Sequence, residues 1–130
     1  MTRPASRAEP APESFLPLTA VVFEILLALA GGDLHGYDIM REVESRTAGD
    51  VSLHAGTLYR ALHRLLRARL IEEIAEIAEP ADAGDARKQD ERRRYYRLTT
   101  LGRGVAVAEA RRLASQVTAA RTRRLLKGSA

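Results

Sequence analysis

The residues with the clearest chemical potential lie in the segment 56–67. Read as a helix, this segment places four leucines on one side, at positions 58, 62, 65 and 66. The other side carries hydrogen-bond donors and positive charge, from Thr57, Arg60, His63, Arg64 and Arg67. Guanidinium groups fork onto guanine or hold phosphates. The segment therefore predicts a DNA-reading helix, although the charge pattern alone also fits a solvated, arginine-rich surface.

A second basic segment follows about twenty residues later and favours the first reading. Residues 92–98 read Arg-Arg-Arg-Tyr-Tyr-Arg-Leu, a short segment typical of a strand. With residues 70–77 it predicts an antiparallel hairpin whose loop, 78–91, forms a wing. Because the loop is acidic, we expect its tip to point away from DNA or to stay mobile. The DNA-binding part of the wing is then Arg87, Lys88, Arg92, Arg93 and Arg94.

Composition limits the class of protein. The chain has 130 residues, 45% of them hydrophobic, which is enough for a single modest core. It has no cysteine, which excludes disulfides, Cys-ligated zinc and thiol catalysis. A net charge of +4 is compatible with nucleic acid. No signal-peptide or membrane-spanning pattern is present, so we expect a cytoplasmic protein without membrane association.

The elements that position the basic helix can be placed in outline. Residues 1–14, rich in proline and alanine, read as a flexible arm. Residues 15–98 form the predicted winged helix-turn-helix, with a first apolar helix ending at Gly31-Gly32 and a second starting at Gly36. The expected fold class is mainly α with a small β-hairpin wing, followed by a C-terminal dimerisation helix.

The C-terminal helix, within residues 99–127, carries an apolar seam and is expected to be capped by Thr99 or Thr100. The seam has 4-3-4-3 spacing, which is typical of helix pairing, and consists of Ala106, Ala110, Leu113, Val117 and Ala120. A second copy of the chain is the simplest partner, and a helix folded back on its own domain is the alternative. We also expect Phe23 and Leu27 at this interface, where a ligand pocket could open beside Leu113 and Val117.

Neither an active site nor a metal site is predicted. The sequence has no GxSxG elbow, Walker A loop or HExxH motif, and no activated nucleophile is evident. The three histidines, at positions 35, 54 and 63, lie in different elements without metal-ligand spacing. We interpret His35 as a turn or capping residue. The expected protein is not an enzyme and needs no cofactor.

These segments resemble the PadR-type transcriptional regulators over about residues 16–126. The motifs that carry the resemblance are His-Gly-Tyr-Asp-Ile at 35–39, Gly-Thr-Leu-Tyr at 56–59, Leu-His-Arg-Leu at 62–65, Arg-Arg-Tyr-Tyr-Arg-Leu-Thr at 93–99, and Leu-Gly at 101–102. The length resembles the shorter subfamily, which has one C-terminal helix. Two departures stand out: His54-Ala55 replaces a Ser-Pro-like pair, and Arg69 stands where the family often has glycine.

The resemblance implies a winged helix-turn-helix homodimer that binds an inverted-repeat operator in double-stranded DNA. Such proteins commonly act as repressors released by a small molecule, here a small hydrophobic or aromatic effector. Thr57, Tyr59, Arg60, His63 and Arg64 would belong to the recognition helix, and Tyr37 would buttress it and contact the DNA backbone. The alternative function is a winged-helix protein-interaction module without specific DNA binding.

Overall fold

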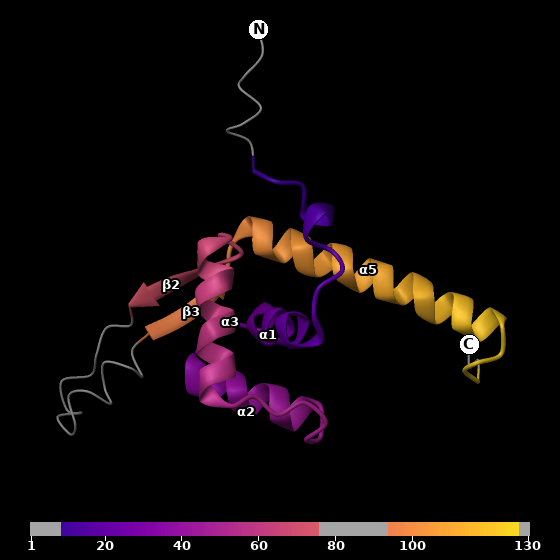
Figure 1. Ribbon diagram of the computed structural model, residues 1–130, viewed down its shortest axis with the longest axis horizontal. Helices are drawn as coiled ribbons and strands as arrows, with labels where there is room; N and C mark the ends of the chain where they lie inside the picture. Colours follow the sequence, from indigo (N-terminus) through magenta and orange to yellow (C-terminus); the bar gives the residue numbers. More distant parts are fainter. Residues whose placement is uncertain (1–8, 76–93, 128–130) are drawn as a thin grey trace, which may run out of the picture.

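In the computed structural model, residues 9–75 and 94–127 are described. The elements follow the order η2 (Pro12–Phe15), α1 (Ala20–Ala30), β1 (Leu34–His35), α2 (Gly36–Arg46), α3 (Ala55–Arg67), β2 (Ile71–Ala75), β3 (Arg94–Leu98) and α5 (Thr100–Thr122). Helices α1, α2 and α3 form the body, the strands lie at one end, and α5 runs away from the other (Figure 1). The expected fold class, mainly helical with a small antiparallel sheet, is confirmed.

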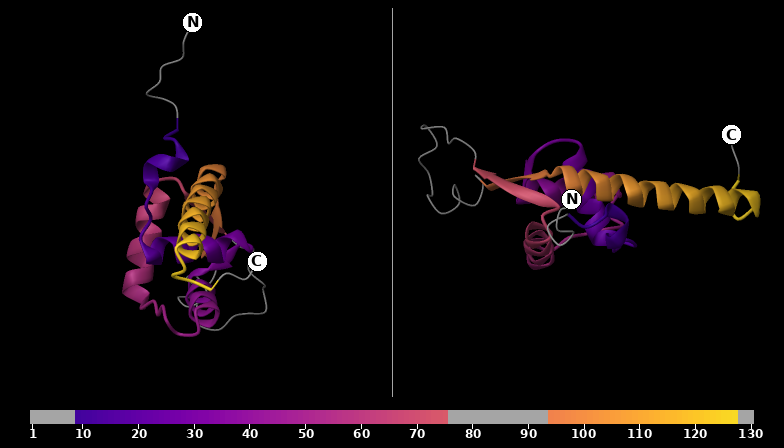
Figure 2. Two further views of the ribbon diagram at one scale, coloured as in Figure 1. Left: turned by 90° about the vertical axis from the view of Figure 1, so that its right-hand side faces the viewer. Right: turned by 90° about the horizontal axis from the view of Figure 1, so that it is seen from above.

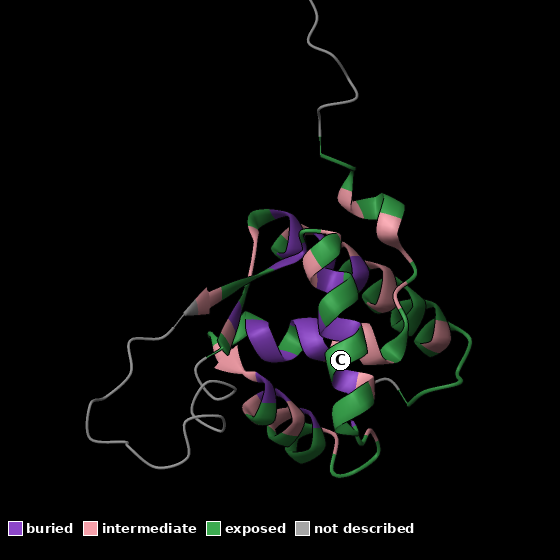
Figure 3. Ribbon diagram, turned by 60° about the vertical axis from the view of Figure 1, so that its left-hand side comes forward, coloured by how far each residue is buried: buried purple, intermediate pink, exposed green. Residues whose placement is uncertain are grey.

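The core lies where one face of each helix meets the sheet. Its buried side chains come from α1, α2, α3, the strands and the first turns of α5 (Figure 3). Ile25 and Leu26 of α1 are fully buried, as are Ile39 and Val43 of α2. Burying each such side chain contributes about 1.5–3 kcal/mol. The apolar periodicity of these helices therefore corresponds to an actual core.

The sheet has three strands in the order β1-β3-β2, all antiparallel neighbours. In β2 and β3, Ile71 pairs with Leu98 and Ala75 with Arg94, so they form the two sides of the expected hairpin. Strand β1 was not predicted from the sequence, and its two residues pair with Tyr95 and Tyr96. A strand this short has no periodicity of its own, because its conformation comes from the partner strand.

The segment before α1 is more ordered than the sequence indicates. Residues 12–14 fall within the predicted flexible arm, but they form most of the 3-10 helix η2. This helix packs on α5, where a Cβ built on Gly104 would lie 3.2 Å from Pro12 Cγ. Phe15, Leu16 and Leu18 then pack against the core. The structured body therefore begins before residue 15.

Helix α5 leaves the body after its first three turns. Leu101, Val105 and Ala106 are buried against the core, whereas most residues from Ala114 onward are exposed. Figure 2 shows the second half of α5 projecting on the side opposite the strands. Among the described residues, no helix has both the length and the apolarity to cross a membrane.

A buried glutamate attaches α5 to the start of α1. Glu109 is 1% exposed, and its carboxylate accepts hydrogen bonds from the Arg112 guanidinium at 2.6 and 2.9 Å. Its Oε2 also accepts from the Leu18 backbone N–H at 3.1 Å. The hydrogen bond from Arg112 holds the pKa of Glu109 below its ordinary value, although burial opposes this shift. The charged form is therefore the one that stabilises the fold.

We expect Glu109→Gln to lower the free energy of unfolding by about 1–3 kcal/mol at neutral pH, because charge-assisted hydrogen bonds to a buried carboxylate are lost. The pKa of Glu109 is lowered by folding, so the contribution is complete above its ordinary value of 4.5 and is lost as the pH falls through the lower, folded value. Urea titrations at pH 7 and at progressively lower pH measure the difference from wild type.

The matched control is Glu44→Gln, because Glu44 is exposed on α2. Its unfolding midpoint should follow that of the wild type at every pH. A Glu109→Gln deficit that persists unchanged at acidic pH would show that the loss comes from packing rather than from the carboxylate charge.

Candidate nucleic-acid interface

Helix α3 has two faces of opposite character. Leu58, Ala61, Leu62 and Leu65 are buried in the core. Arg60, His63, Arg64 and Arg67 are exposed on the other side, and α3 contains no acidic residue. Because the core covers the apolar face of α3, the basic face on the opposite side must point to solvent. The structure therefore brings together three arginines and His63, as the sequence predicts.

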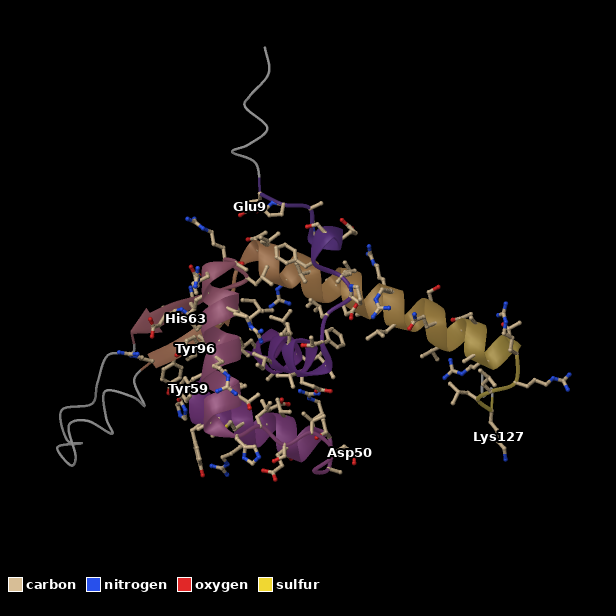
Figure 4. All side chains as sticks on the ribbon, viewed as in Figure 1. Glu9, Asp50, Tyr59, His63, Tyr96 and Lys127 are labelled. Carbon is tan, nitrogen blue, oxygen red and sulfur yellow. The ribbon has the colours of Figure 1, made fainter. Side chains whose placement is uncertain are left out.

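The outer face of α3 is hollowed near its N-terminal half. An open hollow of about 540 Å³ is lined by Gly56, Tyr59, Arg60, His63 and Arg64. The Arg60 guanidinium lies back over the first turn, since a Cβ on Gly56 would be 3.4 Å from Arg60 Nη1. Tyr59 and His63 lie at the same end of the molecule as Tyr96 of β3, far from Lys127 (Figure 4).

The N-terminus of α3 differs from those of α1, α2 and α5, the other α-helices among the described residues. Side chains of Thr19, His35 and Thr99 accept a hydrogen bond at the start of α1, α2 and α5, respectively. At α3 the N-cap residue is His54, which makes no side-chain cap bond. The predicted capping role of His35 is confirmed, with Nδ1 accepting from the Asp38 N–H at 3.3 Å. Thr57 is half-buried in the first, uncapped turn of α3.

Tyr59 has a structural role that the sequence did not indicate. It is 44% exposed, yet its ring packs over the start of α2. A Cβ built on Gly36 would lie 2.5 Å from the Tyr59 hydroxyl. Glycine at position 36 therefore makes room for Tyr59, and the contact fixes α3 against α2. Nothing in the sequence alone links Gly36 to Tyr59, because the two residues lie 23 positions apart on different helices.

Tyr37 lies beside this contact on α2 and is 57% exposed. The Arg41 guanidinium lies 5.6 Å from the centre of its ring, within the range of a cation–π interaction. Tyr37 faces solvent, so its side chain is available to a ligand. Arg41 was not among the predicted site residues, and it adds a cation one turn beyond Tyr37.

The arginines of β3 are paired with acids on neighbouring segments. Arg94 Nε lies 3.5 Å from Glu73 Oε2, and Arg97 Nη2 lies 3.3 Å from Asp33 Oδ2. The Arg94 side chain is 68% exposed, and exposed pairs of this kind contribute little, about 0–1 kcal/mol. Arg94 can therefore exchange Glu73 for a phosphate. The other predicted wing contacts lie outside the described residues: Arg87, Lys88, Arg92 and Arg93.

Arg69 adopts the left-handed conformation that the family's glycine would favour, with φ of 64°. The turn after α3 is therefore retained despite the change of residue, at a cost of about 1 kcal/mol.

The residues predicted for a dimer interface lie along α1 and α5. Ala106 is only 9% exposed and belongs to the chain's own core, so the seam open to a partner starts at Ala110. Leu27 and Val117 are exposed, and the remaining predicted residues are half-buried: Phe23, Leu113 and Ala120.

Metal chemistry finds no support in this part of the molecule. Within residues 9–75 and 94–127, no group of three or more His, Cys, Asp or Glu side chains could hold a metal ion. The face of α3 instead offers cations and hydrogen-bond donors, which bind anions.

Comparison with known proteins gives a family match. The model of the Transcriptional regulator PadR-like family matches residues 25–108. An uncharacterised protein of Lysinibacillus sphaericus is 33% identical over 79 residues, which are 61% of this chain and 64% of that protein. The chain thus spans less than two thirds of that relative.

Solved structures share the fold. A PadR-like transcriptional regulator of Bacillus cereus aligns with a TM-score of 0.62 at 20% identity, over 84% of this chain and 93% of its own. Bacillus subtilis PadR, solved in complex with operator DNA, aligns with a TM-score of 0.55 at 22% identity, over 75% of this chain and 48% of its own.

The contact between Gly36 and Tyr59 predicts a coupled pair of substitutions. Gly36→Ala alone should cost about 0.5–1.5 kcal/mol, because its methyl group must push the hydroxyl end of the exposed Tyr59 side chain out of its rotamer. In a Tyr59→Ala background the collision is gone, and the same change should be neutral or stabilising by about 0.5–1 kcal/mol, since alanine favours a helix over glycine. Urea unfolding of the four proteins gives the coupling energy. An equal cost in both backgrounds would refute the contact.

Proposed function

The chain belongs to the Transcriptional regulator PadR-like family, and on this basis we propose that it is a sequence-specific regulator that binds double-stranded DNA as a homodimer. We propose further that it acts in the cytoplasm as a repressor released by a small-molecule ligand. The observation that carries the proposal is the outer face of α3, where three arginines and His63 are exposed on a helix without a single acid. The shared fold with a PadR solved on operator DNA supports it.

The geometry of α3 suits the major groove. That groove is about 12 Å wide and admits one helix, while the minor groove is about 6 Å wide. Arg60 and Arg64 lie one turn apart beside the hollow, so both can reach base edges together. Each would donate to O6 and N7 of a guanine. Tyr59 and His63 add polar contacts within the same footprint.

Residues near Arg60 and Arg64 would contact the DNA backbone. Thr57 and the uncapped first turn of α3 offer donors to a phosphate. Arg67 of α3, Arg69 in the turn after it and Tyr37 of α2 are exposed and would add contacts to the DNA backbone. On the wing, Arg94 would hold a phosphate together with Arg87, Lys88, Arg92 and Arg93.

The second half of α5 supports a homodimer. Its apolar stripe consists of Ala110, Leu113, Val117 and Ala120 and is only partly covered by the chain's own body. A projecting helix of this kind is marginal unless it packs against something. A two-fold dimer built on this stripe, with Phe23 and Leu27 of α1 beside it, would place two copies of α3 on an inverted repeat. A small hydrophobic or aromatic effector would fit between α1 and α5 of such a dimer.

The alternative is a winged-helix module that binds proteins instead of specific DNA. The exposed Tyr37, with Arg41 stacked on it, is the observation that favours it, because exposed aromatic and arginine side chains are typical of protein interfaces. Salt dependence separates the two functions, since phosphate contacts release counterions.

We expect Arg60→Ala and Arg64→Ala each to weaken binding to the preferred duplex by about 1–3 kcal/mol, or about 5- to 150-fold in Kd, as each removes a guanine contact. The preferred duplex is first selected from a randomised DNA pool with the wild-type protein. Fluorescence anisotropy then measures Kd for each variant on that duplex and on a scrambled one.

Arg111→Ala is the matched control, because Arg111 is exposed on α5 and away from α3. It should bind like the wild type. If the Arg60 and Arg64 variants keep full preference for the selected duplex, α3 is not the reading helix.

Substitutions in the apolar stripe of α5 test the proposed homodimer. Val117→Asp should give monomers, because it places a charge in the apolar stripe on a part of α5 that the chain's own core does not need. Thr118→Asp, one residue on and outside the stripe, should leave the dimer intact. Light scattering at micromolar concentration reports the mass of each. A dimeric Val117→Asp protein would contradict the proposed interface.

A further inference from the structure

The turn after α3 ends in a carbonyl that faces α5. Leu70 N–H donates to the Leu65 carbonyl at 3.0 Å, and Arg69 N–H donates to the Leu66 carbonyl at 3.1 Å. With Arg69 in the left-handed region, these bonds form a Schellman motif. The motif satisfies the last carbonyls of α3 and reverses the chain. It leaves the carbonyls of Arg69 and Leu70 to be satisfied from elsewhere.

Thr99, the N-cap of α5, satisfies both carbonyls. Its backbone N–H donates to the Leu70 carbonyl at 3.1 Å, and its hydroxyl donates to the Arg69 carbonyl at 2.7 Å. The same hydroxyl accepts from the Gly102 N–H at 3.0 Å. One threonine therefore caps α5 and holds the end of α3 at the same time.

Gly102 brings the two helices into direct backbone contact. A Cβ at this position would lie 1.8 Å from the Leu70 oxygen and 2.8 Å from the Leu70 carbonyl carbon. Since backbone is the obstacle, no side-chain movement could relieve the collision. Only glycine allows the first turn of α5 to lie against the turn that ends α3.

A second anchor holds α5 farther along. The Leu18 N–H donates to Glu109, which is buried and bound by Arg112. Seven residues separate Gly102 from Glu109, which is about 10 Å of helix. Two anchors at that separation fix a direction as well as a position. Beyond these two anchors, most residues of α5 are exposed as far as Thr122, and the helix projects from the body (Figure 2).

We propose that Thr99 and Gly102 are positioning residues for operator reading, because they lock the orientation of the projecting half of α5 relative to the recognition helix α3. The inference rests on the proposed function, in which α5 pairs two copies and α3 reads the DNA. The joint between Thr99, Gly102 and the turn at Arg69 and Leu70 then sets the separation and angle of the two reading helices.

The length of α5 makes a small change at the joint important. From Gly102 to Thr122 the helix extends about 30 Å. A tilt of about 5° at the joint moves the far end by roughly 2.6 Å on that length. Successive base pairs are about 3.4 Å apart, so this displacement approaches one step of the half-site spacing. A loosened joint would therefore weaken the preference for one half-site spacing, while the structure of α3 itself stays unchanged.

The test uses spin labels, which the absence of cysteine makes simple. A single Glu44→Cys substitution places one label on exposed α2 of each protomer, and double electron–electron resonance measures the distance between the two labels of a dimer. Thr99→Val removes the hydroxyl while keeping the shape of the side chain. We expect it to broaden the distance distribution roughly twofold, because both hydroxyl hydrogen bonds are lost.

Two controls separate the joint from general damage. Thr99→Ser keeps the hydroxyl and should restore the narrow distribution. Thr100→Val makes the same change one residue on, where the side chain is exposed, and should leave the distribution narrow. If Thr99→Val fails to fold by circular dichroism, Glu109→Gln weakens the second anchor, because the charge pair with Arg112 is lost, and should broaden the same distribution.

The preference for half-site spacing gives a second readout. On the selected duplex and on versions with the spacer changed by one base pair, the wild type should lose affinity sharply, whereas Thr99→Val should lose much less. A variant that is only less stable would bind all spacers with the same relative preference. If Thr99→Val leaves both the distance distribution and the spacer preference unchanged, Thr99 is not a positioning residue. If the wild type is monomeric and its labels show no dipolar coupling, the proposed homodimer is wrong, and this inference is wrong with it.

Discussion

The burial of one face of α3 is the constraint on which the rest of this structure depends. Leu58, Ala61, Leu62 and Leu65 are almost completely inaccessible to solvent. Rotating α3 to hide its cations would expose these side chains and bury guanidinium groups without partners, which costs several kcal/mol per charge. The core thus determines that Arg60, His63, Arg64 and Arg67 point outward together. A cationic reading face follows from apolar packing.

The contacts around α3 explain how such a face can be held in place. Tyr59 fills the space left by Gly36 at the start of α2, and the turn at Arg69 and Leu70 meets the start of α5. Both ends of the helix are therefore fixed by a glycine on a neighbouring element. Glycines at helix starts reduce helix propensity. Gly102 is needed because the Leu70 backbone approaches too closely for a side chain, whereas at Gly36 a Cβ would have to displace the end of the Tyr59 side chain.

Much of this arrangement could be predicted from the sequence, since helical periodicity identifies any segment with one buried face. The four α-helices of the described residues and the basic side of α3 were predicted this way, whereas the hairpin strands were predicted from their β-prone residues and the loop between them. Helix η2 and strand β1 were missed, because a proline-rich turn and a two-residue strand take their conformation from tertiary contacts. Burial of Glu109 was also beyond prediction, since its partner Leu18 lies 91 residues away in the chain. Ala106 fitted the seam by spacing, and only the fold shows that the core uses it.

The measurement that tests the central claim most directly is the affinity of the unmodified protein for the DNA immediately upstream of its own gene, beside a scrambled duplex. Fluorescence anisotropy at two salt concentrations gives both the preference and its ionic component. A specific regulator should bind the upstream DNA tighter by a factor of about 10³ or more, with affinity for both duplexes falling as salt rises. Equal, weak binding to the two duplexes would contradict operator recognition there and favour the protein-interaction module.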